Sequence, residues 1–111
     1  MAHLIIIYWR DIPAQVIAES GRGRNRQQVK IELPRRFVIA IDAAAMKFGA
    51  DYTDDYLAEW RRSNPVSCSD DLDAESTRLA AAIEADYPAE RVRKLVESGG
   101  FDGDSPYFTN A

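Results

Sequence analysis

Residues 5–16, IIIYWRDIPAQV, contain two apolar runs that meet at a proline. The first run, Leu4 to Trp9, is short, continuous and rich in isoleucine and aromatic residues, which favours a β-strand over a helix. Pro13 has no backbone N–H and restricts the residue before it to an extended conformation, so we expect the strand to end near Arg10. Apolar residues resume from Ala14 to Ala18. A connection of about five residues between two such runs predicts a β-hairpin.

A loop and a third strand follow this hairpin. Residues 19–27, ESGRGRNRQ, contain glycines and an asparagine, which are typical of a turn. Residues 28–33, QVKIEL, alternate apolar and polar side chains with the period of a half-buried strand. The sequence therefore predicts a three-stranded antiparallel meander over residues 1–33.

The rest of the chain shows helical periodicity. Four helices are predicted: from Pro34 to Gly49, from Thr53 to Arg62 with Asp51 or Thr53 as N-cap, from Ser69 or Asp70 to Asp86, and from Pro88 to Gly99-Gly100. We therefore expect one α+β domain over residues 1–111. Its three-stranded N-terminal sheet should pack against three to four C-terminal helices within residues 34–100, and residues 101–111 should form a tail.

Composition limits the classes of partner. The chain has a net charge of -4, but residues 1–50 hold 8 Lys/Arg against 4 Asp/Glu, whereas residues 51–111 hold 6 against 14. An acidic chain has little general affinity for nucleic acid, because backbone binding depends on cationic density. One cysteine permits no intramolecular disulfide, and no apolar run is long enough for a signal peptide or a membrane span. We expect a cytoplasmic protein that does not enter a membrane.

Few residues could carry catalysis. Cys68 is the only cysteine and His3 the only histidine, which is too few for a zinc site. The neighbouring Asp70 and Asp71 should raise the pKa of Cys68 and disfavour its thiolate. The sequence also lacks a P-loop, a dinucleotide fingerprint and a Ser-His-Asp set. It therefore predicts no catalytic residue, no metal and no cofactor.

The first candidate binding site is the loop GRGRNR, residues 21–26. In it Arg22, Arg24 and Arg26 alternate with small or turn-forming residues. Guanidinium groups bind phosphate or carboxylate in bidentate geometry, so an anionic partner could dock here. The alternative is a solvated hairpin tip whose charges only keep the protein soluble.

The second candidate is the end of the first strand, with Trp9, Arg10 and Asp11. Arg10 could be presented to a ligand at this point, because Pro13 fixes the backbone nearby. Alternatively, Asp11 accepts hydrogen bonds within a turn and Arg10 pairs with an internal carboxylate.

Three segments, YWRDIPAQV (8–16), LPRRFVIAIDAAAMKFG (33–49) and TDDYLAEWRR (53–62), resemble a small bacterial domain family labelled "virulence factor". That family is related to the C-terminal part of conserved virulence factor proteins, and the likeness extends from Ile6 to Cys68. The resemblance implies an accessory role. Longer relatives join such a domain to a NifU-like module and HEAT-type repeats, and stand-alone relatives are expected near folate or corrinoid one-carbon enzymes. It assigns no reaction and no catalytic residue.

Three functions remain open from the sequence. The first is a non-enzymatic accessory or interaction module that binds a protein or an anionic partner through the Arg-rich loop, or a protein through the Tyr107–Phe108 tail. The alternative is a small enzyme or subunit of folate or corrinoid metabolism, in which Arg10 and the loop arginines hold an anionic ligand and Asp11 acts as a base. RNA stacking on Tyr8 or Trp9 is disfavoured, because stacking requires an exposed face. Convergence of Arg10 with the loop arginines in one cleft would favour a ligand site.

Overall fold

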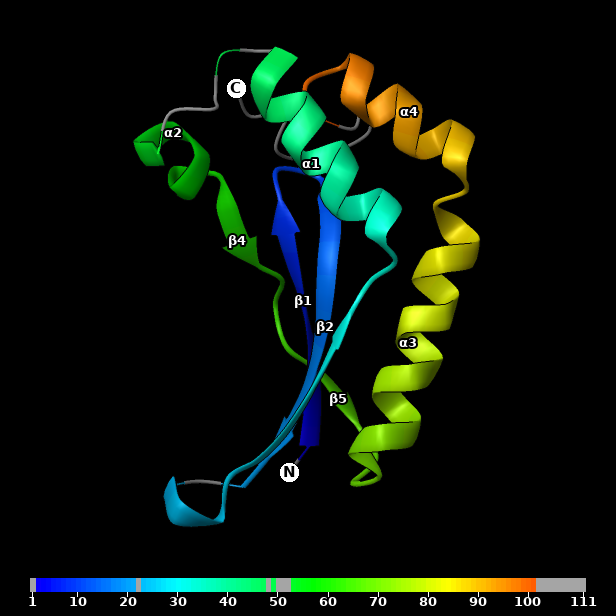
Figure 1. Cartoon of the computed structure of the whole chain (residues 1–111). Helices are drawn as coiled ribbons and strands as arrows, with labels where there is room; N and C mark the ends of the chain where they lie inside the picture. Colours follow the sequence, from blue (N-terminus) through cyan, green and yellow to red (C-terminus); the bar gives the residue numbers. More distant parts are fainter. Residues whose placement is uncertain (1, 22, 48, 50–52, 102–111) are drawn as a thin grey trace.

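The computed structural model describes residues 2–21, 23–47, 49 and 53–101, and their fold is α+β (Figure 1). The elements in chain order are β1 (Ala2–Trp9), β2 (Ile12–Ser20), the short 3-10 helix η1 (Gly23–Asn25), β3 (Gln27–Glu32), α1 (Arg35–Lys47), α2 (Thr53–Ala58), β4 (Trp60–Arg62), β5 (Val66–Cys68), α3 (Leu72–Asp86) and α4 (Ala89–Glu97). All strand pairs are antiparallel. Figure 1 shows α1 and α4 together over the end of the sheet where β1 joins β2, and α3 alongside the sheet.

The expected β1–β2–β3 meander is confirmed, but the connection between β1 and β2 is shorter than expected. Only two residues, Arg10 and Asp11, separate the strands, and Pro13 lies within β2 opposite Tyr8. The register shifts at this point, so that Ala14 is an extra residue of β2, as in a β-bulge. A proline is tolerated here because β3 pairs with β2 only from Gln15 onward.

The sheet gains two strands that the sequence did not predict. The predicted helix from Thr53 to Arg62 is wrong at its C-terminal end, because α2 stops at Ala58 and Trp60–Arg62 forms β4 against β1. The chain then continues along the same edge of β1, where Val66–Cys68 forms β5. Segment 34–100 is therefore not wholly helical. An unpaired edge of the buried strand β1 exposes backbone donors and acceptors, and pairing with β4 and β5 satisfies them.

The sheet register explains which side chains form the core. Leu4 and Ile6 of β1 lie opposite Ala18 and Val16 of β2; Leu4, Ala18 and Val16 belong to one buried apolar cluster, and Ile6 packs against it. Helix α3 packs on β1, β2 and β3 through its buried residues Leu72, Ser76, Ala80 and Ile83. The intervening residues of β2 and β3 point to the other face of the sheet, which we call the polar face; it includes Glu19, Gln28, Lys30 and Glu32, together with the buried Ile17. No helix of the described residues is long and apolar enough to span a membrane.

The helix boundaries follow local chemistry closely. Helices α1, α3 and α4 lie where the sequence predicts helices, with small shifts at their ends. Helix α3 begins at Leu72 rather than Ser69 or Asp70, because the side chain of Asp71 accepts a hydrogen bond from the N–H of Ala74. The proposed N-cap Asp51 and the tail from residue 102 onward lie outside the described residues.

Substitution Asp71→Ala removes this N-cap. We expect the free energy of unfolding to fall by about 1 kcal/mol, because a helix N–H loses its acceptor. Urea denaturation followed by circular dichroism measures the change. The matched control is Asp70→Ala, one residue earlier and outside the capping position, which should cost less than about 0.5 kcal/mol. Equal losses from both variants would contradict the capping role of Asp71.

Candidate functional site

The guanidinium of Arg10 lies inside the fold, between two aromatic rings. Its Cζ is 4.8 Å from the centre of the Trp9 ring and 4.6 Å from that of Phe101. Its Nη1 donates a hydrogen bond of 2.6 Å to the carbonyl of Gly99, and its Nη2 is 3.6 Å from a carboxylate oxygen of Glu59. The side chain is only 12% exposed. Arg10 therefore pairs with internal groups rather than with a ligand. We call the two residues Arg10 and Asp11 the Arg10 turn.

The backbone of the same turn is also bound on two sides. The N–H of Arg10 donates to the carbonyl of Glu59, and the N–H of Asp11 donates to that of Gly100, at 3.0 and 2.8 Å. Arg61 on β4 donates from Nε to the carbonyl of Arg10 at 3.0 Å and from Nη2 to the carboxylate of Asp11 at 3.1 Å. Asp11 is 5% exposed. The turn thus links β4 and the end of α4, and the buried, ion-paired carboxylate of Asp11 is poorly placed to act as a base.

Trp9 belongs to this internal structure as well. Its side chain is fully buried, and its Nε1 donates a 2.9 Å hydrogen bond to the carbonyl of Tyr56. The two rings stack with their centres 5.9 Å apart. Trp9 therefore anchors α2 to the sheet and presents no face to solvent.

The Arg-rich loop lies at the opposite end of the sheet. Strand β2 has 9 residues, so about 30 Å of extended chain separates the loop from the Arg10 turn. Arg24 is exposed in η1, and the side chain of Arg26 is 51% exposed. Arg22 lies outside the described residues. Arg10 and the described loop arginines, Arg24 and Arg26, consequently do not meet in one cleft.

Glu19 organises the loop end of the sheet. Its carboxylate accepts hydrogen bonds from Arg26 Nη2 at 2.6 Å and Gln28 Nε2 at 3.0 Å, and it lies 2.8 Å from His3 Nε2. Arg62 of β4 approaches the same carboxylate to 3.8 Å, with 59% of its side chain exposed. These bonds, Arg26 first and then His3, lower the pKa of Glu19 to about 2. The backbone of Arg62 pairs with Ile7, near the turn end of β1, and only its guanidinium reaches toward Glu19. We call Arg24, Arg26 and this guanidinium the basic end of the sheet.

The Glu19 contacts were not predicted from the sequence, although they follow from strand register. His3 of β1, Glu19 of β2 and Gln28 of β3 are direct cross-strand neighbours on the polar face. The alternating pattern of β3 assigns Gln28 to that face, but only the register brings it opposite Glu19. The sequence predicts Arg62 at the end of a helix, whereas its position on β4 brings its guanidinium toward Glu19.

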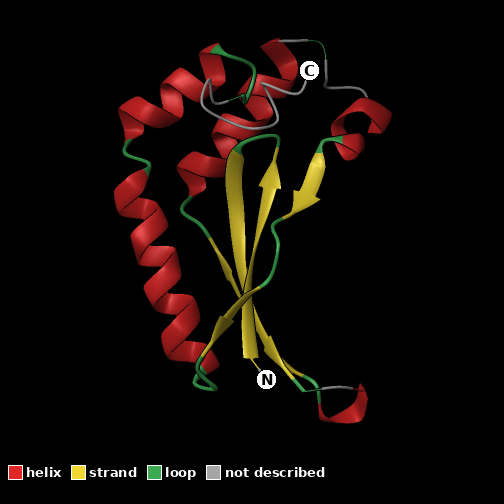
Figure 2. Cartoon of the chain, turned by 180° about the vertical axis from the view of Figure 1, so that it is seen from behind, coloured by secondary structure: helices red, strands yellow, loops and turns green. Residues whose placement is uncertain are grey.

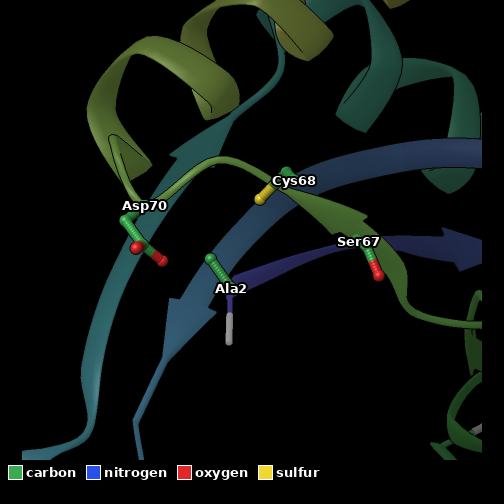
Figure 3. Close-up of a pocket in the computed structure, with 4 residues that line it drawn as sticks. All are labelled: Ala2, Ser67, Cys68 and Asp70. Atoms are coloured by element: carbon green, nitrogen blue, oxygen red, sulfur yellow. The ribbon is translucent and has the colours of Figure 1, made fainter.

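A shallow hollow of about 300 Å³ lies beside β5 (Figure 3), lined by Ala2, Ser67, Cys68 and Asp70. Burial raises the pKa of the Cys68 thiol, and the carboxylates of Glu75 and Asp70 add to this effect. The predicted direction is therefore confirmed, although burial rather than the adjacent acids is its main cause. The neutral thiol is a weak nucleophile, and the hollow offers no group that would activate it among its lining residues.

Fold and site together define a small α+β domain with one internally bonded end and one charged, solvent-facing end. The chain matches the family model described as "Virulence factor" over residues 7–96, and it belongs to that family. The match confirms the resemblance and extends it through α3 and most of α4. Comparison with curated proteins and with solved structures gave no match.

Substitution Gly100→Ala tests the close packing at the Arg10 turn. Gly100 has φ +90°, and an added Cβ would lie 3.2 Å from Trp9 Cζ3 and 3.3 Å from Arg10 Cδ. We expect the free energy of unfolding to fall by about 2–3 kcal/mol from backbone strain and overpacking together. The control Gly23→Ala has φ +58° but no atom within 4 Å of the new Cβ, so it should cost about 1 kcal/mol. Thermal and urea unfolding should separate the two variants, and equal costs would contradict the packing role.

Substitution Glu19→Gln tests the charge network. The native pKa of Glu19 is lowered, so its ionised form stabilises the fold above about pH 4.5, and this contribution is lost as pH falls toward 2. At pH 7 we expect the variant to be less stable by about 1–2 kcal/mol, and the difference from wild type should shrink below pH 4.5. Urea titrations between pH 2 and 7 measure this. The control Glu97→Gln, at an exposed position ending α4, should change the free energy of unfolding at pH 7 by less than about 0.5 kcal/mol.

Proposed function

We propose that this domain is a non-enzymatic interaction module that binds an acidic segment of a protein partner. The docking surface is the basic end of the sheet. The observation that carries the proposal is the arrangement around Glu19. This carboxylate orients Arg26 and approaches Arg62, yet 51% and 59% of these two side chains face solvent. In this proposal the domain acts in the bacterial cytoplasm.

The network keeps a positive charge after its internal pairing. Two guanidiniums share the single carboxylate of Glu19, and Arg24 adds a third cation in η1. A guanidinium has five N–H donors in a planar fork, so Arg26 retains donors after its bond with Glu19. Holding the side chain in place before binding lowers the entropy lost when a carboxylate docks. This arrangement suits carboxylates spaced along an extended segment.

The geometry gives less support to a ligand site in one-carbon metabolism. That hypothesis requires Arg10 and the loop arginines to hold one molecule, with Asp11 as base. Arg10 instead donates to Gly99, and Asp11 accepts from Arg61, about 30 Å of strand away from the loop. A ligand binding at Arg10 would have to replace these bonds, each worth about 1.5–3 kcal/mol where a charged group takes part.

Substitution Arg24→Glu tests the docking surface directly. The probe is a fluorescent peptide of about twelve alternating aspartate, glutamate and glycine residues, titrated with the domain at low and physiological salt. We expect wild type to bind at low salt and to weaken as salt rises, because the contacts are exposed ion pairs. The variant should lose at least about fivefold in affinity, equivalent to about 1 kcal/mol.

The matched control is Arg93→Glu, which makes the same charge change at an exposed position on α4, remote from the loop. It should leave peptide affinity within about twofold of wild type. Equal losses from both variants would show that net charge alone attracts the peptide. Absence of binding by wild type at low salt would also contradict the proposal.

A further inference from the structure

Strand β3 forms a free edge of the sheet. The strand order places β3 beside β2 and at the end of the sheet, and no other strand of the described residues pairs with its outer side. Its pairing with β2 runs without a bulge from Ser20–Gln27 to Gln15–Glu32, and the strand contains no proline. These are the features that let an edge accept a further strand, because nothing in the backbone geometry blocks continued pairing.

The direction of the β3 amides can be derived from one bond. The N–H of Leu33 donates to the carbonyl of Ala14, on the β2 side, at 3.0 Å. Because amides alternate along a strand, those of Val29 and Ile31 also point toward β2. Gln28, Lys30 and Glu32 therefore direct their N–H and C=O groups outward, and all three residues are exposed.

We propose that a second copy of this chain pairs with this edge, antiparallel and related by a two-fold axis at Val29, so that the sheet continues across a dimer. In this register Gln28 lies opposite Lys30 of the second copy, and Glu32 lies opposite its Arg26. Each contact occurs twice, as a two-fold interface requires. Opposite charges that face each other across strands stabilise the pair, and this self-complementarity identifies a second copy as the occupant.

The neighbouring registers are less favourable for physical reasons. An axis at Lys30 would place this lysine opposite itself, and like charges directly opposite each other destabilise a strand pair. An axis at Ile31 would place Pro34 opposite Gln28, and proline has no N–H to donate. The axis at Val29 lets Gln28 and Lys30 of the two copies exchange backbone hydrogen bonds, and it places the N–H of Glu32 opposite the carbonyl of Arg26, whose own N–H donates to Gly23.

The contact between Arg26 and Glu32 is compatible with the internal network. Arg26 uses Nη2 to bind Glu19, and half of its side chain remains exposed. Arg26 directly precedes β3, and its bond to Glu19 places its guanidinium on the polar face, which also carries Glu32. Both side chains therefore lie on the same face as a strand added at this edge. Both proposals use Arg26, so Glu32 of a second copy and an acidic partner would compete for its remaining donors, whereas the tests below need no acidic partner.

A cysteine at the axis tests the register. With Cys68→Ser as background, Val29→Cys places one thiol per copy at a non-hydrogen-bonded pair, where opposing Cα atoms lie about 4.5 Å apart, within the range that a disulfide spans. Oxidation by copper phenanthroline should give a covalent dimer on non-reducing gels, whereas Ile31→Cys should remain monomeric. Circular dichroism of the reduced variants checks that each is folded. Failure of Val29→Cys to cross-link, or cross-linking through Ile31→Cys instead, would overturn the proposal.

The charge contact has a separate test without cysteines. Sedimentation equilibrium of the wild type should show a concentration-dependent dimer, and Glu32→Arg should raise its dissociation constant at least fivefold by placing two cations opposite each other. The control Glu97→Arg makes the same charge change on α4 and should leave the constant within twofold. A wild-type chain that stays monomeric up to millimolar concentration, or a dimer insensitive to Glu32→Arg, would overturn the proposal.

Discussion

The fold depends on the way one two-residue turn is held in place. Arg10 has φ 52°, a left-handed conformation that is costly for a residue with a side chain. The surrounding contacts offset this cost: the backbone of the turn bonds to Glu59 and Gly100, and the guanidinium lies between the rings of Trp9 and Phe101. These contacts join the β1–β2 hairpin to the segment before β4 and to the end of α4. The turn is thus the point where three remote parts of the chain are fixed together.

This fixation divides the sheet into two different ends, as the view from behind shows (Figure 2). At the end covered by α1 and α4, polar groups of the turn bond to other parts of the same chain, although the buried Nε of Arg10 has no hydrogen-bond partner among the described residues. At the far end, where η1 projects beyond the strands, Arg26 and Arg62 share one carboxylate and remain half exposed. The two ends differ because the β1–β2 hairpin has its turn buried under α1 and α4, whereas the loop between β2 and β3 at the far end is exposed to solvent.

Much of the fold could be predicted from local sequence, and the failures have a common cause. Periodicity and helix-stop residues placed α1, α3 and α4, and the proline near Arg10 placed the end of β1. Strand β4 could not be predicted, because Trp60–Arg62 continues a helical pattern and becomes a strand only through pairing with β1. The role of Arg10 was equally inaccessible, since its carbonyl acceptor lies 89 residues further along the chain. Likewise, Glu19 meets His3 only because of the strand register.

The arginines of this chain differ in how much of each side chain is exposed to solvent and in how strongly its N–H donors are already bonded. Arg10 is 12% exposed and already bonded, so any ligand must first break internal hydrogen bonds and displace two aromatic neighbours. Arg62 is 59% exposed and 3.8 Å from its nearest carboxylate, a distance at which little bonding energy is lost when another anion approaches. Arg26 lies between these extremes, with one donor bound and the rest of the fork available. We therefore propose that an anionic partner binds the arginines whose donors are oriented but still available, which in this chain surround Glu19.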